Sequence, residues 1–157
     1  MTSQSVLLDE ISGMLSESDI FNHLPSFEIQ SVRRYFNISQ IARGEVIFHE
    51  GEPGNFMCVL HEGIISVMKA NQAGENVEMA RISRGRALGE MAVLDNELRS
   101  ATCVAATDCV LLTLSSDALD QMLEEAPRPG AKILRAIAVS LSRRLRMAVG
   151  KLVDYPV

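Results

Sequence analysis

Glycines recur through the middle of the chain, and their spacing constrains the fold more than any other feature. Between Gly44 and Gly85 the segment GEVIFHEGEPGNFMCVLHEGIISVMKANQAGENVEMARISRG consists of short apolar runs that glycines separate. Apolar runs separated by turn residues at intervals of about ten residues are typical of strands in a small antiparallel barrel or sandwich. We expect two of the turns to close hairpins, one at Glu62-Gly63 and one at Ala73-Gly74.

Helical patterns lie on both sides of this segment. The first is QSVLLDEISGML at residues 4–15, and in the second Ser26 is expected to cap a helix that runs to Phe36. After one more strand, CVLLTLS, a helix is expected to begin at Ser116 and to stop at Pro127. The last helix, residues 131–149, is expected to end at Gly150. Its apolar stripe consists of Leu134, Ile137, Leu141, Leu145 and Ala148.

The order of these elements predicts an α+β fold that is mainly β. We expect an antiparallel β roll, jelly-roll-like, flanked by N-terminal and C-terminal helices. Residues 1–19 form an N-terminal helical extension, residues 20–150 form the roll with its C-terminal lid helices, and residues 151–157 form a tail.

Composition excludes several classes of protein. The net charge of −5 argues against a large nucleic-acid footprint, and no apolar run reaches the ~20 residues that span a bilayer. The first 20 residues carry no basic residue and so no visible signal peptide. Three cysteines without C-x-x-C spacing are expected to be reduced, buried thiols, which favours a cytoplasmic location.

Candidate catalytic and metal-ligating groups are absent from the sequence pattern. The three histidines have no metal-ligand spacing, and no serine, cysteine or lysine has the context of a nucleophile. We therefore expect no enzyme activity, no catalytic residue, no metal and no catalytic cofactor. Seven residues follow Gly150, too few for a helix-turn-helix, so no DNA-binding domain is expected either.

The segment ALGEMAVLDNELRSATCVAAT, residues 87–107, places charges inside an apolar run. Glu90 and Arg99 either pair with each other, or stay in solvent, or await a ligand, since an unpaired buried charge is costly. A helical turn at GEMAVL would present free amides to an anion. Arg99 presents a fork that suits phosphate oxygens, Ser100 adds a hydroxyl, and Glu90 can accept from a ligand hydroxyl. A sugar phosphate or nucleotide fits these groups.

The segments LGEMAVL and LRSATCVAAT resemble the phosphate-binding cassette of the cyclic nucleotide-binding domain family. The similarity extends from about Ile20 to Arg146 and includes the glycines of the strand region. Arg86 and Leu98 depart from the family pattern, which often has an acidic residue and a proline there.

The resemblance implies that Arg99, Ser100 and amides near Met91 and Ala92 bind the cyclic phosphate, and that Glu90 binds the ribose 2′-hydroxyl. Strand alternation is expected to turn Thr102 toward the pocket together with Ser100. The predicted ligand-binding residues are Leu88, Gly89, Glu90, Met91, Ala92, Arg99, Ser100, Ala101 and Thr102.

The leading functional hypothesis is a soluble sensor of cyclic AMP, with cyclic GMP less favoured, that signals through a protein partner or through a homodimer of its last helix. Two alternatives stay open: a scaffold that no longer binds a nucleotide, and a regulatory subunit of a separate enzyme. The basic run Arg143, Arg144 and Arg146 fits a solvated helix face, a salt-bridged dimer helix or an arginine that reaches over a bound base.

Overall fold

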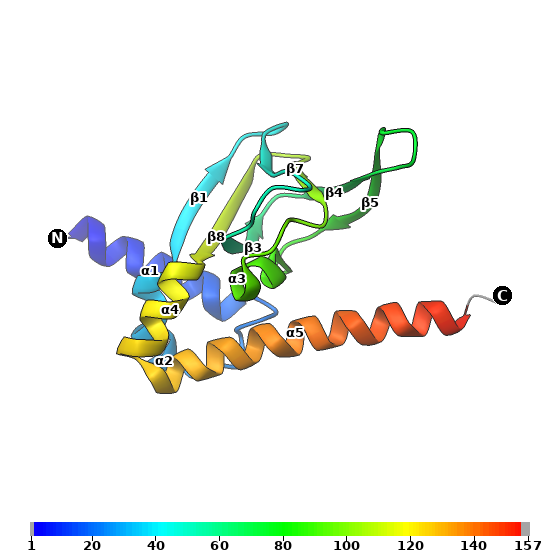
Figure 1. Ribbon diagram of the computed structural model, residues 1–157. Coiled ribbons are helices and arrows are strands. Elements are labelled where there is room, and N and C mark those ends of the chain that lie inside the picture. The colour runs from blue at the N-terminus through cyan, green and yellow to red at the C-terminus, as the bar shows by residue number, and fades with distance from the viewer. Residues whose placement is uncertain (1, 155–157) are drawn as a thin grey trace.

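The computed structural model describes residues 2–154, and its helices and strands follow the predicted order (Figure 1). The helices are α1 (Thr2–Glu17), α2 (Ser26–Val32), the 3-10 turn η1 (Arg33–Tyr35), α3 (Glu90–Asp95), α4 (Ser116–Glu125) and α5 (Pro127–Asp154). The strands are β1 (Asn37–Ile41), β2 (Val46–Phe48), β3 (Phe56–Glu62), β4 (Ile65–Ala70), β5 (Asn76–Ile82), β6 (Ala87–Leu88), β7 (Thr102–Ala105) and β8 (Cys109–Ser115).

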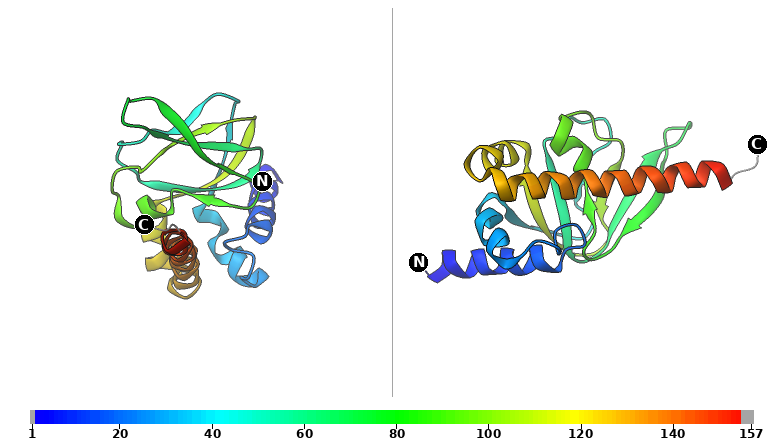
Figure 2. Two further views of the ribbon diagram at one scale, coloured as in Figure 1. Left: turned by 90° about the vertical axis from the view of Figure 1, so that its right-hand side faces the viewer. Right: turned by 90° about the horizontal axis from the view of Figure 1, so that it is seen from below.

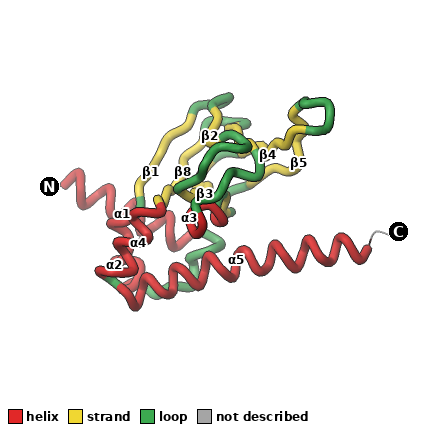
Figure 3. The backbone as a smooth tube through the Cα atoms, in the orientation of Figure 1, coloured by secondary structure: helices red, strands yellow, loops and turns green. Residues whose placement is uncertain are grey.

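Two antiparallel four-stranded sheets form the β roll. One has the strand order β1-β8-β3-β6 and the other the order β2-β7-β4-β5. A small apolar core lies between the sheets and includes Phe48, Leu60, Ile65 and Leu111. The predicted α+β class, with a β roll flanked by helices at both ends, is confirmed (Figure 3).

The two predicted hairpins have different outcomes. The turn at Gly74, where φ is 81°, closes the β4–β5 hairpin, in which Lys69 is paired with Val77. The hairpin expected at Glu62-Gly63 is wrong, because β3 belongs to one sheet and β4 to the other. The chain crosses between the sheets at Gly63, where φ is 102° and the backbone approaches Asp108 too closely to leave room for a side chain.

A second and larger core joins the helices to the sheet that contains β1, β8, β3 and β6. Helices α1, α2, α4 and the first half of α5 contribute buried residues that include Ile11, Leu15, Ile133 and Ile137, and Phe21 joins them from the turn between α1 and α2. Helix α1 therefore shares this second core with the sheet. Figure 2 shows α5 crossing beside the roll, with its C-terminal half directed away from the helical cluster on the side of the β4–β5 hairpin.

The predicted boundaries of two helices, α2 and α5, are wrong. Pro25 rather than Ser26 is the N-cap of α2, since Pro25 has extended backbone angles and Ser26 is already helical. Helix α5 begins at Pro127 and continues past Gly150 to Asp154, so the predicted tail is helical up to that residue, and residues 155–157 lie outside the described part. Proline suits the first turn of a helix, and one glycine costs only about 1 kcal/mol.

The predicted apolar stripe of α5 is buried only in its first part. Ile137 is fully buried and Leu141 partly so, whereas Leu145 is 66% exposed and Ala148 is exposed. The helix has by then passed the edge of the core, so nothing among the described residues covers its last turns. Across the described range no helix combines the length and the apolar character that crossing a bilayer requires.

Candidate functional site

The candidate site surrounds α3, which interrupts the strands between β6 and β7. Gly89 precedes α3 with a φ of 77°, a conformation that side chains other than glycine rarely adopt. A Cβ atom at this position would lie 2.6 Å from Arg99 Nη1. The glycine thus allows the backbone to approach the guanidinium of Arg99, ten positions later in the chain.

A cavity of about 350 Å³ opens beside α3. This volume falls within the range of sites for small organic ligands. Most of the predicted residues line it: Leu88, Gly89, Glu90, Met91, Ala92, Arg99, Ser100 and Ala101. In the structure, the two segments LGEMA and RSA therefore line the same cavity.

The expectation that Thr102 faces this cavity is wrong. Cys103 lines the cavity on β7, and Thr102 does not. The hydroxyl of Thr102 instead accepts a hydrogen bond of 2.8 Å from the backbone amide of Glu50. Strand alternation does not extend back to Ser100, because β7 begins only at Thr102 and Ser100 lies in the bend before it.

Arg99 is 5% exposed, although its charge has no carboxylate partner among residues 2–154. Its Nη2 donates 2.8 Å to the carbonyl of Phe56, and its Nη1 donates 3.4 Å to the carbonyl of Gly89. The guanidinium carbon also lies 3.9 Å from the ring centre of Phe48 and 4.6 Å from that of Phe56. Aromatic faces stabilise a cation, but they do not neutralise its charge.

The environment of Arg99 makes an external anion favourable. Desolvation by burial lowers the pKa of Arg99, although an arginine stays charged at neutral pH. The neighbouring thiols supply no negative charge, because burial raises the pKa of Cys58 to about 12 and that of Cys103 to about 11. No ion pair joins Glu90 to Arg99 and both side chains are buried, so two of the three alternatives for them, mutual pairing and a position in solvent, are wrong.

Glu90 is fully buried and is held by α5. The hydroxyl of Ser140 donates 3.0 Å to Oε2 of Glu90, and Nη2 of Arg144 lies 3.1 Å from Oε1. The second contact is an ion pair without the alignment of a hydrogen bond, because Nη2 donates 2.7 Å to the carbonyl of Ala87. Oε1 accepts no hydrogen bond from any described residue and is free to accept one from a ligand hydroxyl.

The contact between α5 and Glu90 was not predicted from the sequence. Ser140 and Arg144 are four positions apart on a helix and therefore share one face. That spacing in AVSLSRRLR is the signal that could have identified them together. Arg144 lines the cavity, while Arg143 and Arg146 do not. The basic run thus divides between one residue at the site and two residues outside it.

The amides at the start of α3 and the hydroxyl of Ser100 complete the polar wall. No side chain caps α3, and first-turn amides have no acceptor within their own helix. Ser100 is exposed, and its carbonyl accepts 2.9 Å from Lys69 Nζ, which positions the bend next to Arg99. Donors from two separate segments thus border the same cavity as the guanidinium.

The remaining wall combines apolar strand residues with exposed side chains of both charges. Phe48, Val67 and Ile82 come from strands, and the exposed residues are Arg81, Arg86, Asp95 and Glu97. The sequence motif did not identify the strand residues, since they reach the cavity only because the roll closes. In the part of the chain that the structure covers, no group of histidine, cysteine or acidic side chains could hold a metal ion.

Comparisons with known proteins point to one family. The model of the cyclic nucleotide-binding domain matches residues 38–126, more than half of the chain. A solved cyclic nucleotide-binding domain from Methylobacillus flagellatus superposes with a TM-score of 0.81 at 26% identity, covering 96% of this chain and 84% of that chain.

Two curated relatives extend the comparison. The cyclic AMP receptor protein of Thermus thermophilus is 28% identical over 131 residues, which cover 83% of this chain and 59% of that protein. The cAMP-dependent protein kinase regulatory subunit of Mycosarcoma maydis is 29% identical over 157 residues, which cover 96% of this chain and 29% of that protein. The chain thus spans less than two thirds of the length of either relative.

Proposed function

Because the chain belongs to the cyclic nucleotide-binding domain family, we propose that the cavity beside α3 binds a cyclic nucleotide, with cyclic AMP preferred, as the sensing step of a regulatory protein. One observation carries the proposal: Arg99 is buried on the cavity wall and forms no ion pair with any carboxylate within residues 2–154. A single negative charge delivered into the cavity would offset the charge of the guanidinium.

Each polar group of the wall has a role in this proposal. Arg99, the hydroxyl of Ser100 and the amides of Met91 and Ala92 bind the cyclic phosphate, which needs several donors at close range. Glu90 accepts from the ribose 2′-hydroxyl through Oε1. The base lies against the apolar strand residues Val67 and Ile82. Leu88, Gly89 and Ala101 shape the space between these groups.

The preference for cyclic AMP over cyclic GMP rests on the hydroxyls near the base. A hydroxyl on the cassette would stabilise bound guanine by accepting a hydrogen bond from its amino group. The hydroxyl of Thr102 is not placed for this, because it accepts from the backbone amide of Glu50. Ser100 is the one remaining hydroxyl of the motif at the cavity, and the proposal uses it for the phosphate. A Ser100→Ala variant that loses affinity for cyclic GMP alone would contradict this preference.

The proposed output runs through α5. A ligand hydroxyl on Glu90 Oε1 would share that oxygen with Arg144, so binding is expected to change the Arg144 ion pair and with it the position of α5. A second copy of the chain, or another protein, binds the exposed end of α5, which includes Leu145. Three free, buried cysteines support a reducing compartment, and the cytoplasm is the proposed location.

Calorimetric titration of cyclic AMP and cyclic GMP into the whole chain tests the proposal. Removing one partner of a desolvated charge pair costs about 2–5 kcal/mol, so Arg99→Ala should bind roughly 30-fold to several thousand-fold more weakly. Arg99→Lys keeps the charge but loses the fork, and it controls for a folding defect of the alanine variant. Arg128→Ala, on an exposed position of α5, should bind as wild type does. No heat with either nucleotide would refute binding and leave the scaffold alternative.

A further inference from the structure

A second hollow lies along α5 and adjoins the nucleotide cavity, with which it shares Arg86, Ala87 and Arg144. It has a volume of about 860 Å³ and is formed by α5, the chain at residues 19–25 and the start of β6. Figure 2 shows α5 passing beside the segment that follows α1. We call this hollow the α5 groove. Its lining on α5 extends from Lys132 to Met147, about 22 Å of helix.

Positive charge gathers in the α5 groove, although the chain as a whole has a net charge of −5. Arg86, Lys132, Arg135, Arg143 and Arg144 line it, and its acidic lining is a single aspartate. A concentration of one charge sign in a concave surface raises the local potential and attracts the opposite sign.

Three of these five cations are free to pair with a partner. Lys132 is bonded to Glu28, and Arg144 is paired with Glu90. The side chains of Arg86, Arg135 and Arg143 make no ion pair or hydrogen bond with any residue that the structure describes. All three side chains are exposed, so their charges remain hydrated within this chain.

Apolar side chains lie between the cations. Val139 is 40% exposed and Met147 is 61% exposed, and Leu24 and Ala136 form the buried floor. A duplex nucleic acid or a membrane surface would meet a charged rim but could not fill a narrow hollow with apolar walls. A short amphipathic segment with acidic residues along one side complements both features.

We infer that the α5 groove is a docking site for an acidic, amphipathic segment of another protein chain. The acidic residues of that segment pair with Arg86, Arg135 and Arg143, and its apolar residues cover Val139 and Met147. Cyclic nucleotide binding is not required for this docking, so the inference extends beyond the proposed function.

Arg144 connects the α5 groove to the nucleotide cavity, because it lines both. An acidic segment that draws Arg144 away from Glu90 frees the carboxylate for a ligand hydroxyl, and a ligand on Glu90 releases Arg144 to the groove. The two binding events therefore favour one another, by the same factor in each direction. This coupling rests on the proposed function, whereas the docking does not.

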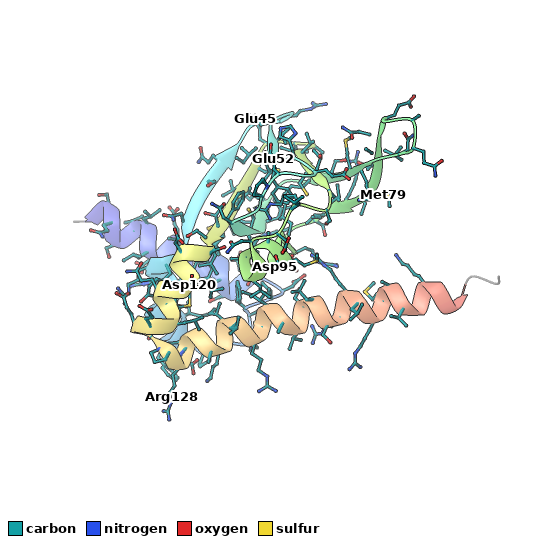
Figure 4. All side chains as sticks on the ribbon, viewed as in Figure 1. Glu45, Glu52, Met79, Asp95, Asp120 and Arg128 are labelled. Carbon is teal, nitrogen blue, oxygen red and sulfur yellow. The ribbon has the colours of Figure 1, made fainter. Side chains whose placement is uncertain are left out.

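Fluorescence anisotropy of the whole chain with a labelled peptide tests the docking. The probe is an amphipathic peptide of about 15 residues, the length that spans the groove, with leucine and glutamate at helical spacing. In the control peptide glutamine replaces every glutamate. The double variant Arg135→Glu/Arg143→Glu reverses two groove charges. Arg128→Glu/Arg146→Glu makes the same change of net charge on the same helix outside the groove, and Figure 4 shows Arg128 directed away from the roll.

Docking in the groove predicts that Arg135→Glu/Arg143→Glu weakens binding of the glutamate peptide at least ~10-fold, since like charges at an interface cost several kcal/mol. The matched double variant should bind within about twofold of wild type, and the glutamine peptide should bind far more weakly. Equal losses in both double variants, or equal binding of the two peptides, would overturn the inference.

Two further measurements test, first, other possible occupants of the α5 groove and, second, the coupling between the groove and the nucleotide cavity. The first measurement replaces the peptide with a DNA duplex or with phosphatidylserine vesicles. The peptide site would be overturned if one of these bound wild type and bound Arg135→Glu/Arg143→Glu more weakly, while the peptide did not bind at all. Saturating cyclic AMP should tighten peptide binding. Unchanged affinity in a chain shown to bind both ligands would overturn the coupling and leave the docking in place.

Discussion

At the scale of single residues, Glu90 connects helix α5 to the proposed ligand through two different carboxylate oxygens. In this structure its carboxylate holds Ser140 and Arg144, and in the proposed complex it accepts from the ribose 2′-hydroxyl. A hydrogen bond to a charged group contributes about 1.5–3 kcal/mol. Wild type should therefore bind 2′-deoxy cyclic AMP roughly 10- to 150-fold more weakly than cyclic AMP.

Glu90→Gln should narrow that difference between the two ligands, because the charge that strengthens the hydrogen bond is gone. Glu124→Gln, an exposed substitution on α4, should leave the difference unchanged and serves as the control in the same calorimetric titration. Equal affinity of wild type for the two ligands would remove Glu90 from the site.

Gly89 and Gly74 form a matched pair for measuring how tightly the cassette is packed. Both have a positive φ, 77° and 81°, so a substitution to alanine strains the backbone at either position. Only at Gly89 would the new Cβ also meet the guanidinium of Arg99, whereas nothing lies within 4 Å at Gly74. Gly89→Ala should thus lower the free energy of unfolding by at least about 1 kcal/mol more than Gly74→Ala, as measured by urea denaturation. Equal losses would show that the cassette accommodates the methyl group.

At the scale of elements, α5 is the part of the fold that should respond to ligand. Hydrogen exchange of residues 130–149 with and without cyclic AMP tests this, because in the proposed complex the ligand hydroxyl shares Glu90 Oε1 with Arg144 of α5. We expect changed exchange near these two residues and little change in α1, which has no contact with the cavity. Identical exchange under calorimetrically saturated binding would refute the switch.

Local sequence patterns predicted those helices and turns that neighbouring residues determine. Helical periodicity indicated α1, the positions of Ser116 and Pro127 indicated the bounds of α4, and the Ala73-Gly74 turn indicated the β4–β5 hairpin, since neighbouring residues determine each of them. Gly63 has the same turn signal but connects two sheets, and strand pairing is decided by packing across the whole roll. The contact of Glu90 with Arg144 joins residues far apart in sequence, and no periodicity within one segment encodes it.

The motif predicted the part of the cavity wall around α3 and Arg99 for a related reason. The segments LGEMA and RSA each carry their own polar groups, and one short loop brings them together. Thr102 departs from the prediction because the strand begins later than the motif suggests. Val67 and Ile82 reach the cavity from strands that no motif links to it.

At the scale of the whole molecule, buried thiols make the free energy of unfolding depend on pH. Burial raises the pKa of Cys58 to about 12, whereas an unfolded cysteine titrates near 8.5. Below about pH 8.5 the thiol is neutral in both states and its contribution is fully present. Above that pH the unfolded chain releases the proton and the folded chain does not, so stability is lost as the pH rises toward 12.

Urea denaturation between about pH 8 and about pH 10.5 measures this loss, to which one such thiol contributes up to ~1.4 kcal/mol per pH unit. Cys58→Ala should be less stable at the lower pH, because it leaves a small void, but its stability should fall less steeply as the pH rises. Parallel curves for the variant and wild type would show that Cys58 does not titrate in this way.

The central claim is that the charge of Arg99 is offset by the phosphate of a cyclic nucleotide. Nuclear magnetic resonance of the arginine side chains tests it most directly, with Arg99→Lys used to assign the Arg99 guanidinium signal. Saturating cyclic AMP should shift that signal and slow its exchange with water, together with shifts of the Met91 and Ala92 amides. Saturated binding that leaves the Arg99 signal unchanged would contradict the claim.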